Sequence, residues 1–159
     1  MNLLNGLLDD ELIFLKLKCN SKEQLLGWLG NELIEKGYVL QGYEKALLER
    51  EALYPTGLVT TSCGVAIPHA EPSYVIKERI AIAILEDGVA FGNMGALDEE
   101  VLVRVVFLLA LNHSSQHLEV LQAVTSLFQN EAFMNNIQKA ATKEDVLELF
   151  QSILLEKRG

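Results

Sequence analysis

Residues 56–71 read TGLVTTSCGVAIPHAE and combine turn-forming residues, β-forming residues, a proline and a histidine. Within them, residues 65–67 (VAI) are a short apolar run of the kind that forms a buried strand. Pro68 holds Ile67 in an extended conformation, because the proline ring clashes with an α-helical predecessor. The sequence therefore predicts a short, stiff strand that leads to His69, where the chain turns and a partner can reach the imidazole ring.

The length and composition of the chain are those of one globular domain. It has 159 residues, half of them apolar, and helix-type and strand-type segments alternate along it. We therefore expect a single domain over residues 1–159, of the α/β or α+β class. The net charge of −9 argues against a nucleic-acid partner or an anionic membrane surface, because both attract clustered Lys and Arg. It suits a protein that docks on a basic patch of another protein.

The sequence also predicts a reduced, cytoplasmic protein. The N-terminal segment has no basic region, and residues 9–11 (DDE) interrupt its apolar run, so we expect no signal peptide. The longest apolar run, residues 105–111, has seven residues, too few for a transmembrane helix. The two cysteines, Cys19 and Cys63, form no CxxC motif.

Apolar periodicity and capping residues predict the other elements of the fold. Ser21 is expected to cap a helix, with Gln24 completing a capping box and Gly37 ending it. Three glycines predict a loop over residues 88–95, with Phe91 as its anchor. The remaining predictions are strands over residues 12–19, 79–85 and 101–111, and helices over residues 43–53, 116–129 and 133–140 and from Thr142 onward.

Two of these elements carry expectations about burial. The β-branched density of residues 101–111 is typical of a central strand that is buried on both faces. In the helix that follows, helical spacing predicts that one apolar stripe faces inward. That stripe contains Leu118, Leu121, Val124, Leu127 and Phe128.

Of the three histidines, His69 and His117 occupy positions that favour chemistry. His69 ends one strand, and His117 begins a helix that follows the most apolar strand. In an open α/β sheet, ligands collect outside strand ends, at loops and helix N-termini. The two rings can therefore meet at one site.

A pair of imidazoles at such a site suits phosphoryl transfer. Neutral imidazole is a competent nucleophile near neutral pH, and its attack on phosphorus gives a phosphohistidine. A phosphoryl group in transfer carries negative charge on its oxygens, which N–H donors and cations stabilise. His117 could donate one hydrogen bond, and Arg50 could supply a guanidinium. Arg50 could equally be an exposed arginine that stabilises the end of its helix.

Two other site chemistries remain open from the residues alone. His113 and His117 are spaced HxxxH, which on one helix would present both rings to zinc. Two serines between them have the character of helix caps, which would place His113 before the helix, and no glutamate follows His113. Both features argue against a zinc site. Cys63 and His69 could form a nucleophilic pair, although a small buried thiol on a strand is the more frequent role for such a cysteine.

Three segments resemble the enzyme IIA domains of the mannitol–fructose class from the bacterial sugar phosphotransferase system. Residues 47–72, LLEREALYPTGLVTTSCGVAIPHAEP, match the core motif, which contains an Arg-Glu pair, a Pro-Thr pair and a Gly-x-Ala-Ile-Pro-His run. Residues 116–128 resemble the second histidine segment, and residues 142–154 resemble the closing helix. The details most resemble the galactitol-type branch, on residues 54–58 (YPTGL) and 91–95 (FGNMG). Regulatory, nitrogen-related homologues share the Pro-His motif.

The resemblance implies a fold, a reaction and its partners. It implies an α/β fold whose mixed sheet is flanked by helices on both faces. It implies a phosphotransferase in which His69 accepts a phosphoryl group from the carrier protein HPr, on the tele nitrogen, and passes it to a cysteine of enzyme IIB. The membrane component IIC would be contacted only indirectly. His117 would stabilise the phosphoryl group, Arg50 would supply charge, and the transfer would need no metal or cofactor. The residues alone leave the choice of ring nitrogen open.

Overall fold

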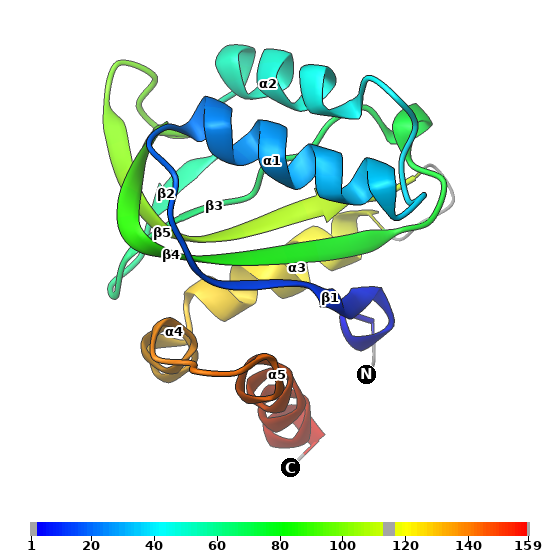
Figure 1. The fold of residues 1–159 in the computed structure, drawn as a ribbon. Helices are drawn as coiled ribbons and strands as arrows, with labels where there is room; N and C mark the ends of the chain where they lie inside the picture. The colour runs from blue at the N-terminus through cyan, green and yellow to red at the C-terminus, as the bar shows by residue number, and fades with distance from the viewer. Residues whose placement is uncertain (1–2, 113–116, 159) are drawn as a thin grey trace.

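The structure, a computed structural model, describes residues 3–112 and 117–158 (Figure 1). Its centre is one sheet with the strand order β1-β4-β5-β3-β2. β1 and β4 are parallel, as are β3 and β5, whereas β4–β5 and β2–β3 are antiparallel. The sheet is therefore mixed, as expected. Its strands are β1 (Leu8–Leu17), β2 (Gly57–Val59), β3 (Gly64–Ala66), β4 (Arg79–Gly92) and β5 (Glu100–Ala110).

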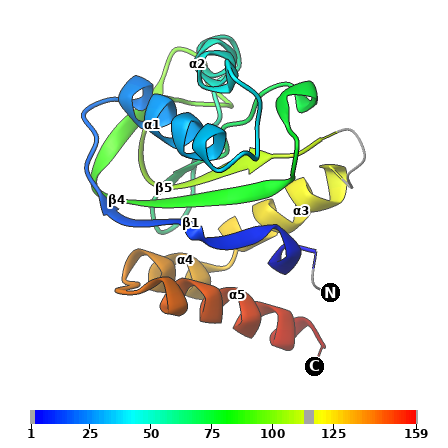
Figure 2. The same ribbon diagram turned by 45° about the vertical axis from the view of Figure 1, so that its right-hand side comes forward.

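Helices cover both faces of the sheet, which confirms the predicted α/β architecture. α1 and α2 lie on one face, and α3, α4 and α5 lie on the other (Figures 1 and 2). Each face has its own apolar core. β5 contributes Val103 and Val106 to the core under α1 and α2, and Val105 and Phe107 to the opposite core. The helices are α1 (Lys22–Glu35), α2 (Tyr43–Leu53), α3 (His117–Phe128), α4 (Glu131–Gln138) and α5 (Lys143–Arg158).

The predicted central strand is β5, the third of the five strands in the sheet. The short strand β3, which leads to His69, lies directly against it. Gly64 permits this approach, because a Cβ atom there would lie 2.2 Å from the carbonyl oxygen of Leu102. Beyond β3 the contact continues, since the Leu109 N–H donates to the Pro68 carbonyl oxygen at 3.0 Å. The segment before His69 is thus attached to the most buried strand.

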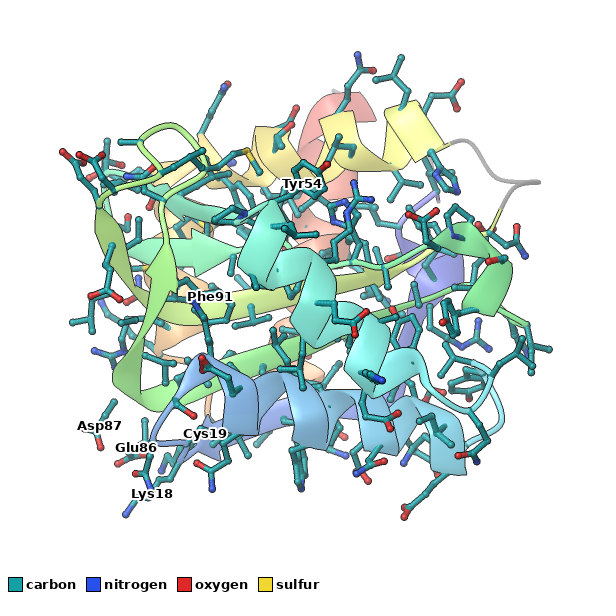
Figure 3. The ribbon with its side chains drawn as sticks, turned by 90° about the horizontal axis from the view of Figure 1, so that it is seen from above. Lys18, Cys19, Tyr54, Glu86, Asp87 and Phe91 are labelled. Atoms are coloured by element: carbon teal, nitrogen blue, oxygen red, sulfur yellow. The ribbon has the colours of Figure 1, made fainter. Side chains whose placement is uncertain are left out.

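β4 is longer than the sequence predicted, and the loop expected over residues 88–95 is wrong in its first half. The strand continues to Gly92, with Val89 and Phe91 buried. A large bulge separates its two halves, because residues 85–88 lie opposite the single residue Arg104. Figure 3 shows Glu86 and Asp87 pointing outward at this bend. Such a bulge carries turn-like residues inside a strand, which hides the alternation from a sequence reading.

Several helix ends follow the predicted capping chemistry. The Ser21 hydroxyl accepts from the Gln24 N–H at 3.1 Å, and the Thr142 hydroxyl accepts from the Asp145 N–H at 3.1 Å. In a capping box, the Gln24 side chain would accept from the N–H of Ser21 in return. Here it accepts from the N–H of the preceding residue, Asn20, at 2.7 Å. Gly37 ends α1 with a φ of 78°, a conformation that favours glycine.

Other boundaries differ from prediction. β1 spans Leu8–Leu17 instead of residues 12–19, with Lys16 at a φ of 51° near its end. α4 begins at Glu131 because the Asn130 side chain caps it, accepting from the Phe133 N–H at 2.9 Å.

The predicted inward stripe of α3 is only partly right. Its last three members are buried, but Leu118 is 66% exposed and Leu121 is 37% exposed. Both lie in the first half of the helix, where Val120, 1% exposed, is the residue that packs against the sheet.

Within the part of the chain that the structure describes, no helix is both long and apolar enough to cross a lipid bilayer.

Candidate functional site

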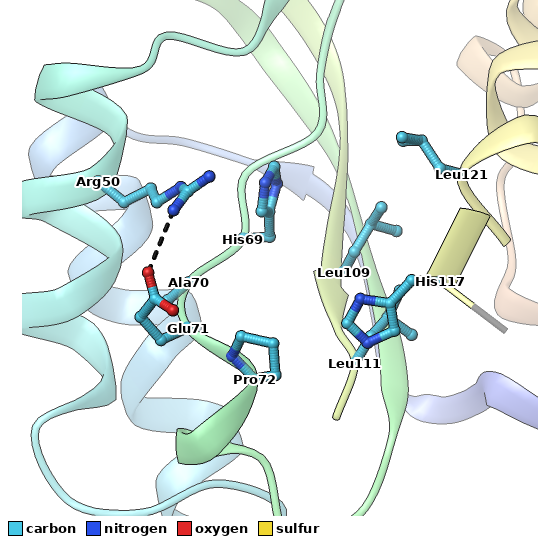
Figure 4. A pocket seen from close by; sticks show the side chains of 9 residues that line it. All are labelled: Arg50, His69, Ala70, Glu71, Pro72, Leu109, Leu111, His117 and Leu121. Atoms are coloured by element: carbon cyan, nitrogen blue, oxygen red, sulfur yellow. Dashed lines mark hydrogen bonds and ion pairs between the residues drawn. The ribbon is translucent and has the colours of Figure 1, made fainter. Parts of the chain in front are cut away.

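A pocket of about 330 Å³ lies at the end of β3 and β5, beside the start of α3. Its walls come from α2, from the segment after β3, from the end of β5 and from α3. Figure 4 shows the His69 ring between Arg50 on one side and His117 on the other. The three residues singled out from the sequence therefore line one pocket. The complete lining is Arg50, His69, Ala70, Glu71, Pro72, Leu109, Leu111, His117 and Leu121.

The imidazole of His69 is oriented by a hydrogen bond to its own chain. Its Nδ1 atom lies 2.9 Å from the carbonyl oxygen of Ile67. A carbonyl oxygen only accepts, so Nδ1 carries the proton and donates it. In the neutral ring, Nε2 is then the atom with a free lone pair. This arrangement favours Nε2 over Nδ1 as the nucleophile, a choice that the residues alone left open.

His117 is the first residue of α3, and its ring is also held by backbone. Its Nε2 atom hydrogen-bonds the carbonyl oxygen of Asn112, so Nε2 is the donor. The N–H of Asn112 in turn donates to the carboxylate of Glu78 at 2.9 Å. Nδ1 of His117 can donate to a ligand only when the ring is protonated. Sequence reasoning missed Glu78, whose contact with Asn112 joins residues that are distant in sequence.

Arg50 reaches the pocket from the last turns of α2. Its Nη1 atom lies 3.2 Å from Oε1 of Glu71, and its guanidinium carbon lies 5.0 Å from the centroid of the Tyr54 ring. The side chain is 36% exposed, so it is accessible from solvent while it faces the pocket. Glu71, which the sequence reading left without a role, thus supplies a carboxylate to the same wall.

A buried carboxylate fixes the turn after α2. Glu51 is 2% exposed, and its two oxygens accept from the N–H of Thr56 at 2.7 Å and from the Thr56 hydroxyl at 2.9 Å. Burial raises the pKa of the Glu51 carboxyl, and the hydrogen bonds from Thr56 oppose that rise. The contact holds the end of α2, and with it Arg50, against the start of β2. Sequence reasoning quoted both residues without anticipating that they bond.

Cys63 has no place in the pocket. It directly precedes β3 rather than lying within it, is partly buried, and is absent from the pocket lining. Burial raises the pKa of its thiol, which disfavours the reactive thiolate. The geometry therefore gives no support to a Cys63–His69 nucleophilic pair.

The alternative zinc site pairs His117 with His113, which lies outside the described residues. Among residues 3–112 and 117–158, no group of three or more His, Cys, Asp or Glu side chains could hold a metal ion.

Comparison with known families gives a match over most of the chain. Residues 6–153 match the family described as "Phosphoenolpyruvate-dependent sugar phosphotransferase system, EIIA 2". The chain is 29% identical to the mannitol-specific EIICBA component of Pasteurella multocida over 148 residues, which are 91% of this chain and 23% of that protein. It therefore spans less than a quarter of the length of that relative.

A galactitol-specific component and a transcriptional regulator match this chain at similar identity. The galactitol-specific EIIA component of Escherichia coli O6:H1 is 30% identical over 108 residues, which are 68% of this chain and 71% of that protein. The transcriptional regulator ManR of Bacillus subtilis is 30% identical over 130 residues, which are 80% of this chain and 18% of that protein.

Solved structures share the fold. The crystal structure of IIA mannitol from Escherichia coli is 28% identical, with a TM-score of 0.74 over 89% of this chain and 96% of that chain. The same values of identity and TM-score hold for enzyme IIA in a solved complex of the Escherichia coli mannitol enzyme IIA with phosphorylated enzyme IIB, over 89% of this chain and 95% of that chain.

Proposed function

Because the chain belongs to the type 2 EIIA family of the phosphoenolpyruvate-dependent sugar phosphotransferase system, we propose that it is a cytoplasmic phosphocarrier whose phosphorylated residue is His69. HPr would be the donor and a cysteine of enzyme IIB the acceptor. The observation that carries this proposal is the orientation of the His69 ring, which faces a pocket with Nδ1 bonded to Ile67 and Nε2 left with its lone pair.

The proposed reaction is two displacements at phosphorus. In the first, Nε2 of His69 attacks the phosphorus of phospho-HPr, and the P–N bond to the HPr imidazole breaks with its electron pair left on HPr. In the second, a cysteine thiolate of enzyme IIB attacks, and the P–Nε2 bond breaks. His69 returns to the neutral ring, with Nδ1 still donating to Ile67. No metal is needed, because the negative charge can be balanced by cationic side chains.

Arg50 and His117 are the proposed cations. Both line the pocket with His69, on opposite sides of its ring in Figure 4. Arg50 can donate to the phosphoryl oxygens from its guanidinium. The Nε2–H of His117 is occupied by Asn112, so His117 contributes through Nδ1 as the protonated ring.

A protein partner suits this pocket better than a small ligand. Exposed apolar side chains lie on the elements that border it, with Leu53 and Tyr54 at the end of α2, and Leu118 and Leu121 on α3. Exposed apolar residues next to a polar site are typical of protein–protein contacts. The net charge of −9 favours a partner with a basic surface, and the related mannitol enzyme IIA is solved in complex with enzyme IIB.

The transported compound is proposed to be galactitol or a related polyol. The galactitol-type segments, residues 54–58 and 91–95, contact each other: Gly57 and Asn93 form a β-bridge, and the Met94 N–H donates to the Gly57 carbonyl at 2.8 Å. These residues therefore have a packing role as well. Mannitol-specific and galactitol-specific relatives match at similar identity, so mannitol is the main alternative for the transported compound.

A second candidate function is regulation. In that case the phosphorylation state of His69 would control a partner and no sugar would be transported. The similarity to the regulator ManR is the observation that favours it.

The test is phosphoryl transfer in vitro. The protein is incubated with labelled phosphoenolpyruvate, enzyme I and HPr, and the expected product carries an acid-labile, base-stable phosphate that is absent from His69→Ala. Adding a panel of enzyme IIB proteins then separates the two functions. Transfer to a polyol-specific IIB supports transport, and label that no IIB accepts supports regulation. No label on the wild-type protein would refute both.

A further inference from the structure

The carboxylate of Glu71 shares the pocket with the proposed phosphoryl site. Its Oε1 atom lies 3.2 Å from Nη1 of Arg50, and both side chains line the pocket that contains His69. A carboxylate in this place is unexpected for a site that receives an anion, because like charges repel. Its position suggests a role in the reaction.

The position of Glu71 is coupled to that of His69 by the chain itself. Only Ala70 separates them, and Pro72 follows Glu71 as the first residue of a short 3-10 helix. A residue that precedes proline is restricted to extended conformations, and Glu71 has the corresponding ψ of 135°. The carboxylate is therefore presented to the pocket by a stiff segment.

Arg50 has one charged partner in the described residues and room for another. The Nε atom of Arg50 is buried and has no hydrogen-bond partner among the described residues, while the Tyr54 ring covers one face of the guanidinium. The ion pair with Glu71 is largely solvent-accessible, with the Glu71 side chain 64% exposed. Exposed ion pairs are weak, so a phosphoryl group on His69 can displace the carboxylate.

We propose that Glu71 is a positioning residue that holds Arg50 while His69 is unphosphorylated and competes with the phosphoryl group for its guanidinium afterwards. This inference rests on the proposed phosphocarrier function. The competition makes the phosphohistidine less stable than Arg50 alone would make it. The phosphoryl group consequently stays available for transfer to the next protein, which is what a carrier requires.

The test compares Glu71→Gln with the wild-type protein. The equilibrium between phospho-HPr and the phosphorylated protein is measured first, and the rate of onward transfer to a IIB acceptor second. Glu71→Gln should shift the equilibrium toward the phosphorylated protein by about two- to fivefold, as expected for the loss of an exposed ion pair. Onward transfer should slow correspondingly, and Glu71→Asp should restore part of both values. Glu32→Gln, which breaks the partly exposed pair with Lys36 on α1, is the control and should change neither.

A double-mutant cycle separates action through Arg50 from direct repulsion. If Glu71 acts through Arg50, the Glu71→Gln shift disappears in an Arg50→Gln background. A shift that persists there, or a Glu71→Gln protein that behaves as wild type, overturns the inference while the carrier function stands. A wild-type protein that accepts no phosphoryl group overturns both.

Discussion

The carboxylate of Glu51 accepts both hydrogen bonds that Thr56 can donate, one from its backbone N–H at 2.7 Å and one from its hydroxyl at 2.9 Å. Glu51 lies in the last turn of α2, the helix that carries Arg50, and Thr56 begins the segment that leads through β2 and β3 to His69. Both residues are almost completely buried. The pair therefore links two walls of the pocket through a contact that solvent cannot replace.

Removing the Thr56 hydroxyl should destabilise the protein. In Thr56→Val, one oxygen of a buried carboxylate loses its donor, and the free energy of unfolding should fall by about 1–3 kcal/mol. Urea unfolding measures the change. Thr61→Val removes a hydroxyl at an exposed position of the neighbouring turn and serves as the control. Equal stability of Thr56→Val and the wild-type protein would contradict the importance of the contact.

The same pair predicts a pH dependence. Burial raises the pKa of the Glu51 carboxyl in the folded protein, against the opposing effects of the Thr56 hydrogen bonds and the charge of Lys22. A carboxyl with a raised pKa favours folding below its unfolded-state pKa, and this contribution is lost as pH rises through the folded-state pKa. Glu51→Gln does not titrate. The stability of Glu51→Gln relative to the wild-type protein should therefore increase as pH rises from about 4 to neutral.

Unfolding of both proteins in urea at a series of pH values measures this difference. The exposed substitution Glu35→Gln provides the baseline, because an exposed carboxyl should contribute little to it. A difference between Glu51→Gln and wild type that stays constant across the range, or moves the other way, would contradict the sign.

Tyr43 and Tyr38 should respond in opposite directions to removal of their hydroxyls. Tyr43 is fully buried in the core under α1 and α2, its hydroxyl has no hydrogen-bond partner among the described residues, and burial raises its pKa. Tyr43→Phe should therefore raise the free energy of unfolding by about 1 kcal/mol. The Tyr38 hydroxyl donates to Asp9 at 2.5 Å, so Tyr38→Phe should lower it. Thermal and urea unfolding distinguish the two, and a destabilised Tyr43→Phe would show that its hydroxyl has a partner.

His117→Ala should slow phosphorylation of His69 without unfolding the protein. Loss of one donor to a developing negative charge costs about a hundredfold in rate. Rapid-quench measurement of transfer from phospho-HPr tests this, and circular dichroism checks the fold. Gln122→Ala, an exposed change on the same helix, is the control. Transfer at the wild-type rate in His117→Ala would remove this residue from the mechanism.

Several parts of the fold and site could be predicted because local chemistry determines them. The bounds of α2 match the prediction, since Pro55 lies just beyond its end, and Ser21 and Thr142 cap their helices as expected. The convergence of two histidines followed from a rule about strand ends and helix starts. Each of these depends on residues that are close in sequence or on general sheet topology.

The features that were missed depend on contacts between distant segments. The bulge in β4 is opposite Arg104 of another strand, and its turn-like residues read as the end of the strand. Helical spacing predicted that Leu118 faces inward, but the residue of that turn that packs against the sheet is Val120, and only the folded chain shows which side of α3 the sheet covers. Arg50 and Glu71 are 21 residues apart, and only the folded chain shows that they form an ion pair.

Identifying the phosphorylated atom is the sharpest test that His69 is the phosphocarrier residue. The protein is phosphorylated with phosphoenolpyruvate, enzyme I and HPr, and the modified residue and ring nitrogen are identified by tandem mass spectrometry and phosphorus NMR. We expect one phosphoryl group, on Nε2 of His69, and none on His69→Ala. A phosphoryl group on Nδ1, on another residue, or at full occupancy on His69→Ala would contradict this assignment.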